Sequence, residues 1–496
     1  MAGLIFARTR RSLGVFSRGT DMRVIARSLC ISAAVVAATM AGQVAAQEPS
    51  ADEAAFRALY KQLVEINTTR SVGSCTQAAE AMQARLVAGG IPRSDTQILA
   101  PPDRPKDGAL IAILHGSDKL AKPILLLAHI DVVEAKRADW QRDPFKLVEE
   151  DGWFYARGSS DDKAMAAAFT DSLIRYKKEG FMPRRGIKLA LTCGEETPDV
   201  FNSVKWLTQT HPDVLSAAFA LNEGAGGELD NNGKHIALQI QAGEKVYQDF
   251  KLQAVDVGGH SSRPTHDNPI AHLAAGLAKL SAYSFPVAFN QATRGYFEAE
   301  SKLVAADAAT PMRAVLADPK DEAAIEKLWA LNPGWNSMLR TTCVVTQIEG
   351  GHAPNALPQH VGANVNCRIL PGVPVEEVQK MLASVMDDPM IKIEPTGEPG
   401  MQSAPPPLGE KIMEPVRKVA ESMWPGVAIV PTMSTGATDG RFLNAVGVPT
   451  YGLSGMFHDA EGSRAHGLNE RIRVKSLLDG RKFLYEVVKL YANSAH

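Results

Sequence analysis

The chain has 496 residues, of which 45% are hydrophobic and 22% are charged. This composition excludes a fibrous or disordered protein, and the length predicts two domains. With 53 Lys and Arg against 55 Asp and Glu, the net charge is −2, so no basic excess favours nucleic acid or anionic lipid as a partner.

Residues 1–46 have the pattern of a secretory signal peptide that is removed from the mature protein. Arginines precede an apolar stretch at 29–40, which is followed by the small-x-small sequence Val44-Ala45-Ala46. The apolar stretch is shorter than the ~20 residues that span a bilayer, which favours cleavage over a retained membrane anchor. Residues 9–13 resemble a twin-arginine export motif, so the export route stays open. We therefore expect a secreted or periplasmic protein with no membrane segment after cleavage.

From about residue 51 to 243, helical spacing of apolar residues alternates with short, almost wholly apolar runs. The expected helices are 52–69, 76–89, 163–178 and 199–210, and the expected strands are 110–114, 124–128, 187–192 and 217–221. Apolar runs of this kind suit strands that are buried on both faces of a parallel or mixed sheet. The alternation predicts the α/β class.

After residue 243 the pattern changes to strands that alternate apolar and polar residues. Strands are expected at 246–254, 342–348 and 363–369, covering helices at 272–280 and 374–386, and a helical insertion at about 290–336. The α/β pattern then resumes, with strands at 427–431 and 448–453 and a closing helix at 474–491. We therefore predict one α/β domain, residues 47–243 and 401–496, that is interrupted by an α+β domain at 244–400.

Four cysteines follow the signal peptide: Cys75, Cys193, Cys343 and Cys367. They form no CxxC pair, which argues against a cysteine zinc site or a redox motif. Cys343 and Cys367 lie in two strand-like runs. In an oxidising compartment they would either form a disulfide across an antiparallel pair or remain two buried thiols.

Acidic residues and one histidine follow predicted strands of the first half, in His129-x-Asp131, Glu195-Glu196 and Glu223, and Asp161-Asp162 lies in a turn that opens the predicted helix 163–178. The carboxyl ends of strands in an open α/β sheet meet at one edge, where ligands bind. So many carboxylates would repel one another unless they stay protonated or a multivalent cation neutralises them. Histidine and carboxylate ligands suit zinc, with cobalt or manganese as substitutes. Two metals about 3.5–4 Å apart, bridged by one carboxylate, would use the whole set.

Each motif alone has an ordinary explanation. His129 would serve as a core histidine, Glu195-Glu196 as a solvated loop, and Asp161-Asp162 as a helix N-cap. Their shared position after consecutive strands favours the metal site.

In this order the motifs resemble those of the two-zinc peptidase family of glutamate carboxypeptidase, aminoacylase, acetylornithine deacetylase and succinyl-diaminopimelate desuccinylase. The resemblance runs from about residue 60 to the C-terminus, apart from 290–336. The matching segments are His129-x-Asp131, Arg157-Gly158-x-x-Asp161-x-Lys163, Gly194-Glu195-Glu196, Asn222-Glu223-Gly224, Gly258-Gly259-His260-Ser261-Ser262-Arg263-Pro264 and His466-Gly467-x-Asn469-Glu470. The resemblance implies a zinc-peptidase-like catalytic domain with a mixed, mostly parallel sheet flanked by helices, interrupted by a lid and dimerisation domain.

Carried over position by position, the resemblance implies five metal ligands for two Zn²⁺ ions. Asp161 would bridge the metals, His129 and Glu223 would complete one site, and Glu196 and His466 would complete the other. His458 competes with His466, but the Gly-x-Asn-Glu sequence after His466 favours His466.

The same resemblance assigns the chemistry to two further residues. Asp131 would orient His129 from behind, and Glu195 would be the general base that takes a proton from a metal-bridging water and passes it to the leaving nitrogen. It also implies a cis peptide bond between Asp161 and Asp162.

Four residues resemble substrate-binding positions of the family. His260 resembles a histidine that the lid or a partner subunit brings to the reacting carbonyl, and Asn355 lies in a segment that resembles a lid loop. Arg368 resembles an arginine that holds a substrate carboxylate, and Thr438 belongs to a loop that resembles a substrate-contacting one. The alternatives are a surface histidine, an arginine on an exposed strand and an ordinary turn before a helix.

These features predict an exported two-zinc metallopeptidase, a carboxypeptidase or dipeptidase of small peptides, which forms a homodimer through its lid domain. An N-acyl-amino-acid deacylase with the same site is the alternative, and the sequence does not separate the two substrates. A catalytically inactive binding domain on the same fold would be expected only if ligands or the base were missing, and all are present.

Overall fold

The computed structural model describes residues 49–197, 200–397, 400–401 and 403–494. The predicted signal peptide lies outside the described residues. Within them, no helix combines the length and the apolar character that crossing a bilayer requires.

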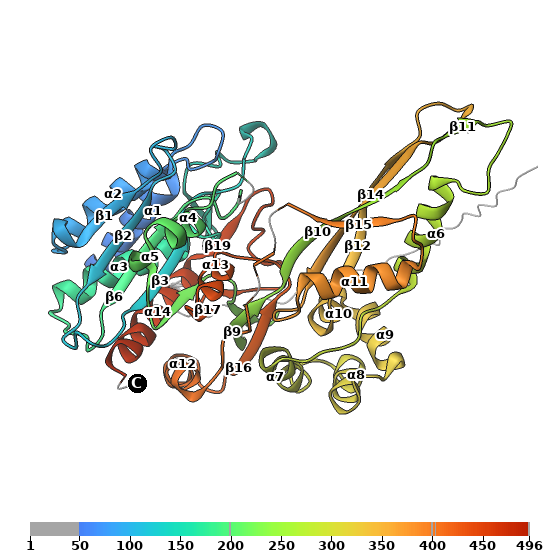
Figure 1. The fold of residues 1–496 in the computed structure, drawn as a ribbon. Helices are drawn as coiled ribbons and strands as arrows, with labels where there is room; N and C mark the ends of the chain where they lie inside the picture. The colour runs from blue at the N-terminus through green and yellow to red at the C-terminus, as the bar shows by residue number, and fades with distance from the viewer. Residues whose placement is uncertain (1–48, 198–199, 398–399, 402, 495–496) are drawn as a thin grey trace, which may run out of the picture. The chain divides into compact units, whose positions relative to one another are not determined.

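A large mixed sheet forms the centre of the α/β domain (Figure 1). Among the described residues its strands follow the order β1-β2-β6-β3-β7-β17-β9-β8-β18, and β16 pairs with β9. Their bounds are β1 (Thr96–Leu99), β2 (Ala109–Leu114), β3 (Ile124–His129), β6 (Ile187–Thr192), β7 (Phe219–Asn222), β8 (Gly227–Leu229), β9 (His235–Glu244), β16 (Ala428–Ser434), β17 (Thr450–Gly452) and β18 (Phe457–His458). Strands β6, β3, β7 and β17 are parallel neighbours, so β17, from the C-terminal part of the chain, completes the predicted sheet.

Helices cover both faces of this sheet because its strands are apolar on both sides. Leu126 packs into a core with α1 (Ala51–Glu65), α2 (Cys75–Ala88), α3 (Lys163–Lys178), α12 (Glu410–Met423) and α14 (Val474–Asn493). Its neighbour Leu127 points to the opposite face, toward α4 (Ser203–Thr210) and α13 (Gly440–Ala445). Alternate side chains of a strand point to opposite faces, so the predicted doubly covered sheet is confirmed.

Short elements complete this domain: the helix α5 (Pro212–Leu215), the 3-10 turns η1 (Arg93–Asp95) and η2 (Arg137–Asp139), and a three-stranded sheet of β4 (Val148–Glu150), β5 (Trp153–Tyr155) and β19 (Arg471–Arg473). None of these short elements was predicted, nor were β1, β8 and β18. They are brief and lack a long apolar or alternating run.

The second sheet is antiparallel, with the order β12-β14-β10-β15. Its strands are β10 (Val246–Val255), β12 (Thr342–Gly350), β14 (His360–Ile369) and β15 (Lys392–Thr396), and α6 (Pro269–Ala282) and α11 (Val375–Met386) pack against it. Residues of β10 alternate between buried and less buried positions, as their sequence predicts for a sheet covered on one face. Cys343 and Cys367 face each other across β12 and β14 and form a disulfide, the first of the two alternatives.

The predicted helical insertion consists of α7 (Gln291–Glu300), α8 (Ala306–Ala317), α9 (Glu322–Leu331) and α10 (Pro333–Leu339). Its apolar residues, such as Phe297 and Leu328, share a core with Ala237 of β9 and Val430 of β16. The insertion therefore packs against strands of the large sheet, although it interrupts the sequence of the second domain.

Candidate active site

The five predicted metal ligands converge at the carboxyl edge of the large sheet. His129 is the last residue of β3, Glu223 directly follows β7, and Glu196 lies in the loop after β6. These three strands are parallel neighbours, so their ends meet at one edge. Asp161 precedes α3, and His466 lies in the loop between β18 and β19.

The ligand atoms form two groups that share Asp161. In one group, His129 Nε2 lies 3.0 Å from Asp161 Oδ1 and 3.8 Å from Glu223 Oε2. In the other, His466 Nε2 lies 3.2 Å from Asp161 Oδ2 and 2.9 Å from Glu196 Oε2. Each oxygen of Asp161 therefore faces a different histidine, which is the geometry that a bridging carboxylate requires.

The rival histidine does not join either group. His458 lies on β18, and burial lowers the pKa of its imidazole. His466, by contrast, has a φ of 60°, in the left-handed region, and its ring reaches Asp161 and Glu196. The structure also contains the cis peptide bond between Asp161 and Asp162 that the resemblance implied.

The electrostatics of the site favour the binding of cations. Burial, and then the negative charge of Glu223, raise the pKa of Glu195 well above its ordinary value. Hydrogen bonds to Asp161 and Glu196 raise the pKa of His466 to about 10. The donor set of histidine nitrogens and carboxylate oxygens fits zinc, whose positive charge would neutralise the clustered carboxylates.

Asp131 connects His129 to the loop that carries the two glutamates. One of its carboxylate oxygens lies 3.6 Å from His129 Nδ1, and the backbone carbonyl of Asp131 lies 3.1 Å from the same nitrogen. Its two carboxylate oxygens also accept hydrogen bonds from the backbone amides of Glu195, at 3.4 Å, and Glu196, at 3.1 Å. The predicted contact with His129 is present, and the bonds to the two glutamates were not predicted.

Glu470 holds the loop that carries Asp161, a connection that the sequence did not predict. The carboxylate is fully buried, and Oε2 accepts hydrogen bonds from Arg157 Nη1 at 2.8 Å and from the Gly158 amide at 3.0 Å. Oε1 accepts hydrogen bonds from the amides of Ser160, at 2.8 Å, and Asp161, at 3.0 Å. The motif after His466 thus links the histidine loop to the loop of the shared carboxylate.

Asp439 is a second buried carboxylate that the sequence did not single out. Its oxygens accept hydrogen bonds from the Asn202 side chain at 2.6 Å and from the Thr192 hydroxyl at 2.9 Å. Asn202 also donates to the carbonyl of Gly194 at 3.2 Å. Asp439 therefore stabilises the loop that begins after β6, from the side of α13.

Thr438 directly precedes Asp439 and is buried. Its hydroxyl accepts hydrogen bonds from the Asn222 side chain and from the Gly440 amide, both at 3.0 Å. These bonds place it next to Glu223 and at the start of α13, and its predicted contact with substrate stays a prediction.

His260 is the last residue of β11 (Gly259–His260), which pairs with β13 (Ala356–Leu357) in a separate two-stranded unit. Asn355 directly precedes β13, and its carbonyl accepts a hydrogen bond from the Ser261 amide at 3.0 Å. This unit follows the far end of β10, which has ten residues and spans about 33 Å at ~3.3 Å per residue. The five ligands lie near the other end of β10. The structure therefore does not bring His260 and Asn355 to the ligand groups of their own chain (Figure 1).

Arg368 lies on β14 with its guanidinium over the ring of Tyr247, 4.7 Å from the ring centroid. Burial lowers the pKa of Arg368, and its side chain is partly buried. The structure thus gives it a structural contact, and its predicted role in holding a substrate carboxylate is untested.

Glu244, behind Thr438, leads to a prediction about the pH dependence of stability. Burial raises its pKa to about 8. One carboxyl oxygen accepts a hydrogen bond from the Thr438 amide at 2.7 Å, and the other has no hydrogen-bond partner among the described residues. Because the folded protein holds this proton more tightly than the unfolded chain does, the contribution is complete below pH ~4.5 and is lost as the pH rises to about 8.

The free energy of unfolding should fall less steeply between pH 5 and 8 in Glu244→Gln than in the wild type. The two slopes should differ by up to ~1.4 kcal/mol per pH unit, which is the contribution of one titrating proton. Chemical denaturation of metal-depleted wild-type and variant protein over this range measures the slope. Equal slopes in the two proteins would contradict the assignment. Glu377→Gln, at an exposed position in the first turn of α11, is the control.

The mixed sheet and the two groups of histidine and carboxylate side chains that share Asp161 are typical of one class of protein, the metal-dependent hydrolases. The chain belongs to peptidase family M20/M25/M40, whose family model matches residues 125–490. Members of this family are metallohydrolases that act on amide bonds, and this chain is an enzyme of that type.

Three similar proteins illustrate the family. Human N-fatty-acyl-amino acid synthase/hydrolase PM20D1 is 31% identical over 388 residues, which cover 76% of this chain and 75% of the human protein. The M20 family metallo-carboxypeptidase Sso-CP2 of Sulfolobus solfataricus superposes with a TM-score of 0.64 at 19% identity, covering 88% of this chain and 99% of that one. The Bacillus subtilis YXEP protein, described as a dinuclear metal binding peptidase, has a TM-score of 0.54 at 11% identity, covering 88% of this chain and 98% of that one.

Proposed function

We propose that the protein is a two-zinc amidohydrolase that cleaves the amide bond of an N-acyl amino acid. The observation that carries this proposal is the position of Asp161, whose two oxygens face His129 and His466 in two adjoining ligand groups. The second candidate is a carboxypeptidase or dipeptidase with the same site. The prediction from the sequence was a peptide substrate, with an N-acyl amino acid as the alternative. The 31% identity to a hydrolase named for N-fatty-acyl amino acids favours the acyl substrate.

The five predicted ligands would bind the two metal ions in two groups. His129, Asp161 and Glu223 would hold one Zn²⁺, and His466, Glu196 and the second oxygen of Asp161 would hold the other. When bound, the ions would polarise the substrate carbonyl and lower the pKa of a water toward neutrality. Cobalt or manganese would serve as substitutes.

Glu195 belongs to neither ligand group and is free to act as the general base. Burial, and then the negative charge of Glu223, raise its pKa above the ordinary value, which is the direction that suits a carboxyl acting as a general base. In the proposed reaction Glu195 takes the proton of the attacking water and donates it to the leaving nitrogen. Asp131 fixes the backbone of Glu195 through its amide.

Hydrolysis by the zinc-loaded mature protein tests the function directly. N-acyl amino acids of increasing acyl length and a matched set of dipeptides are assayed side by side, with and without a chelator. We expect turnover of N-acyl amino acids that a chelator abolishes and that Zn²⁺, Co²⁺ or Mn²⁺ restores. Turnover of dipeptides alone would favour the second candidate. Activity that survives complete metal removal would refute the proposed mechanism.

The protein is also proposed to be exported from the cytoplasm. The N-terminal segment has the pattern of a signal peptide, and the described chain contains two disulfides, Cys75–Cys193 and Cys343–Cys367. Disulfides persist mainly in oxidising compartments, which supports a secreted or periplasmic location. N-terminal sequencing of the exported protein would locate the cleavage site, expected after Ala46.

A homodimer through the second domain would supply what one chain lacks near its site. His260 lies beyond the far end of β10, so a partner subunit is the proposed source of the histidine that reaches the reacting carbonyl. The edge strand β12 supports this arrangement, because among the described strands it pairs only with β14, and it exposes 57% of Val344 and 66% of Ile348. An exposed apolar edge strand is a ready surface for another chain.

We expect the double substitution Val344→Glu and Ile348→Glu to convert a dimeric wild-type protein into a monomer, because like charges would then face each other across the joined edges. Light scattering after gel filtration measures the mass. Leu120→Glu, at a position that is 95% exposed on the α/β domain, is the control and should leave the mass unchanged. A monomeric wild-type protein, or a dimeric double variant, would contradict the proposal.

A further inference from the structure

The disulfide Cys75–Cys193 joins the start of α2 to the loop of the proposed base. Cys75 is the first residue of α2, and Cys193 is the first residue after β6, directly before Gly194, Glu195 and Glu196. Both cysteines are buried, with 3% and 5% of their surface exposed. The bridge therefore connects a helix on one face of the sheet to the segment that carries the base and one metal ligand.

Hydrogen bonds hold this segment from the sides of α4 and β3 as well. On the side of α4, Cys193 exchanges two hydrogen bonds of 2.8 Å with Ser203, through the Cys193 amide and the Cys193 carbonyl. On the side of β3, the carboxylate of Asp131 accepts the amides of Glu195 and Glu196. A carboxylate oxygen of Asp131 also lies within 4.8 Å of both cysteine sulfurs, so the bridge packs against the group that holds the two glutamates.

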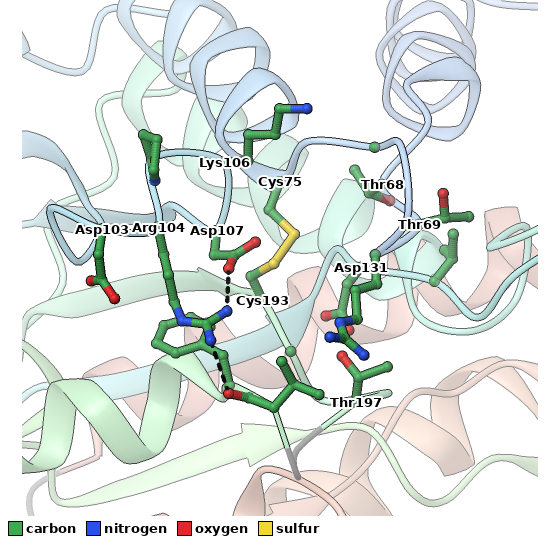
Figure 2. Close-up of a pocket in the computed structure, with 17 residues that line it drawn as sticks. Thr68, Thr69, Cys75, Asp103, Arg104, Lys106, Asp107, Asp131, Cys193 and Thr197 are labelled. Atoms are coloured by element: carbon green, nitrogen blue, oxygen red, sulfur yellow. Dashed lines mark hydrogen bonds and ion pairs between the residues drawn. A yellow bond between two sulfur atoms is a disulfide. The ribbon is translucent and has the colours of Figure 1, made fainter.

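The disulfide also borders open space, beside the segment that precedes α2 and the loop between β1 and β2. The two cysteines, Asp131, Gly194 and Thr197 line a cavity of about 310 Å³ (Figure 2). Side-chain packing fixes a segment only where atoms fill the space beside it. Here the cavity interrupts such packing, and the covalent bond supplies the connection instead.

We propose that the Cys75–Cys193 disulfide is a positioning element of the active site, which holds Glu195 in register with the metal ligands. This inference rests on the proposed function. A displacement of about 1 Å in a reacting group can cost ~100-fold in rate, so loss of the bridge should lower kcat much more than it changes substrate affinity. The second disulfide, across β12 and β14, joins neighbouring strands of the other sheet and has no such role.

The test compares two matched double variants at saturating Zn²⁺ and at a temperature where circular dichroism shows both to be folded. For Cys75→Ser with Cys193→Ser, we expect kcat to fall about 10- to 100-fold, with KM within about threefold and bound zinc unchanged. For Cys343→Ser with Cys367→Ser, in a sample whose mass by light scattering equals that of the wild type, we expect the kcat of the wild type. A Cys75–Cys193 variant that melts earlier but keeps the wild-type kcat would show a purely structural bridge and would overturn the inference.

Reduction of the wild-type protein provides a second measurement that does not depend on the folding of the variant. A phosphine donates two electrons to the disulfide; water supplies two protons to the sulfurs and its oxygen to the phosphorus, which leaves two thiols and a phosphine oxide. We expect kcat to fall in the wild type and in the Cys343–Cys367 variant as the thiols appear, with no further loss in the Cys75–Cys193 variant. Unchanged kcat with both wild-type disulfides open would overturn the inference.

The amidase activity and the positioning role of the Cys75–Cys193 disulfide can be refuted separately. A folded, zinc-loaded wild-type protein with no amidase activity would overturn the proposed function, and the inference with it. An active wild type together with an equally active Cys75–Cys193 variant would overturn the inference alone.

Discussion

Replacement of Glu195 by alanine should abolish turnover while about two zinc ions remain bound per chain. Both expectations follow from the geometry. Glu195 contributes no atom to either ligand group, so the metals keep their ligands. The hydrogen bond from its backbone amide to the Asp131 carboxylate does not involve the Glu195 side chain and persists in the variant. What disappears is the carboxyl that moves the proton, and a positioned acid-base group contributes about 10²- to 10⁴-fold to a rate.

Two further variants make this experiment specific. Glu195→Gln keeps the size of the side chain and removes only its ability to take a proton, so it should be as inactive as the alanine variant. Glu134→Gln changes an exposed carboxylate that accepts hydrogen bonds from the amide and the hydroxyl of Ser71, and this variant should keep the wild-type kcat. Steady-state kinetics with metal analysis of the same samples measures all three. Wild-type turnover in either Glu195 variant would refute the assignment of the base.

The central part of the fold could be predicted because its strands are strongly apolar. The run from Ile124 to Ala128 is buried on both faces, and only a strand covered by two layers requires such a sequence. The alternation from Val246 to Ala254 likewise matches a sheet covered on one face. Strands such as β8 and β18 have two or three residues, and they pair only because other parts of the chain place them side by side.

The site could be predicted to the extent that it follows strand ends. His129, Glu196 and Glu223 come after three neighbouring strands, so their convergence followed from the sheet alone. His466 lies in an irregular loop with a left-handed backbone, and only the resemblance to known motifs identified it. Its position beside Asp161 and Glu196 agrees with that resemblance.

The supporting residues of the site could not be predicted, because their partners are distant in sequence. Cys75 and Cys193 are 118 residues apart, one at a helix start and the other in a loop, and neither location indicates a partner. Cys343 and Cys367 are 24 residues apart in two alternating runs, which is why a bridge between them could be considered. Glu470 had a recognisable motif around it, but only the three-dimensional structure shows which amides it accepts.

Glu470→Ala should have the largest effect on stability of any single substitution at the site. The carboxylate is fully buried and accepts four hydrogen bonds, one of them from the buried guanidinium of Arg157. Removing one member of a buried ion pair typically costs about 3–5 kcal/mol, because the other charge is left without a partner. The amides of Ser160 and Asp161 would lose their acceptor as well, and the shared metal ligand would no longer be held in place.

We therefore expect Glu470→Ala to unfold at a clearly lower denaturant concentration and to bind zinc more weakly than the wild type. Glu470→Gln keeps the volume but turns an amide group toward backbone donors, so it should show a smaller loss of both and provides a folded sample if the alanine variant is unstable. Glu461→Ala removes an exposed carboxylate of the same loop, paired with Arg464 and Arg471, and should cost no more than about 1 kcal/mol. Denaturant titration and competitive zinc binding measure the two quantities. If zinc affinity were unchanged in both Glu470 variants, the hydrogen bonds from this residue to the Asp161 loop would not determine the geometry of the metal site.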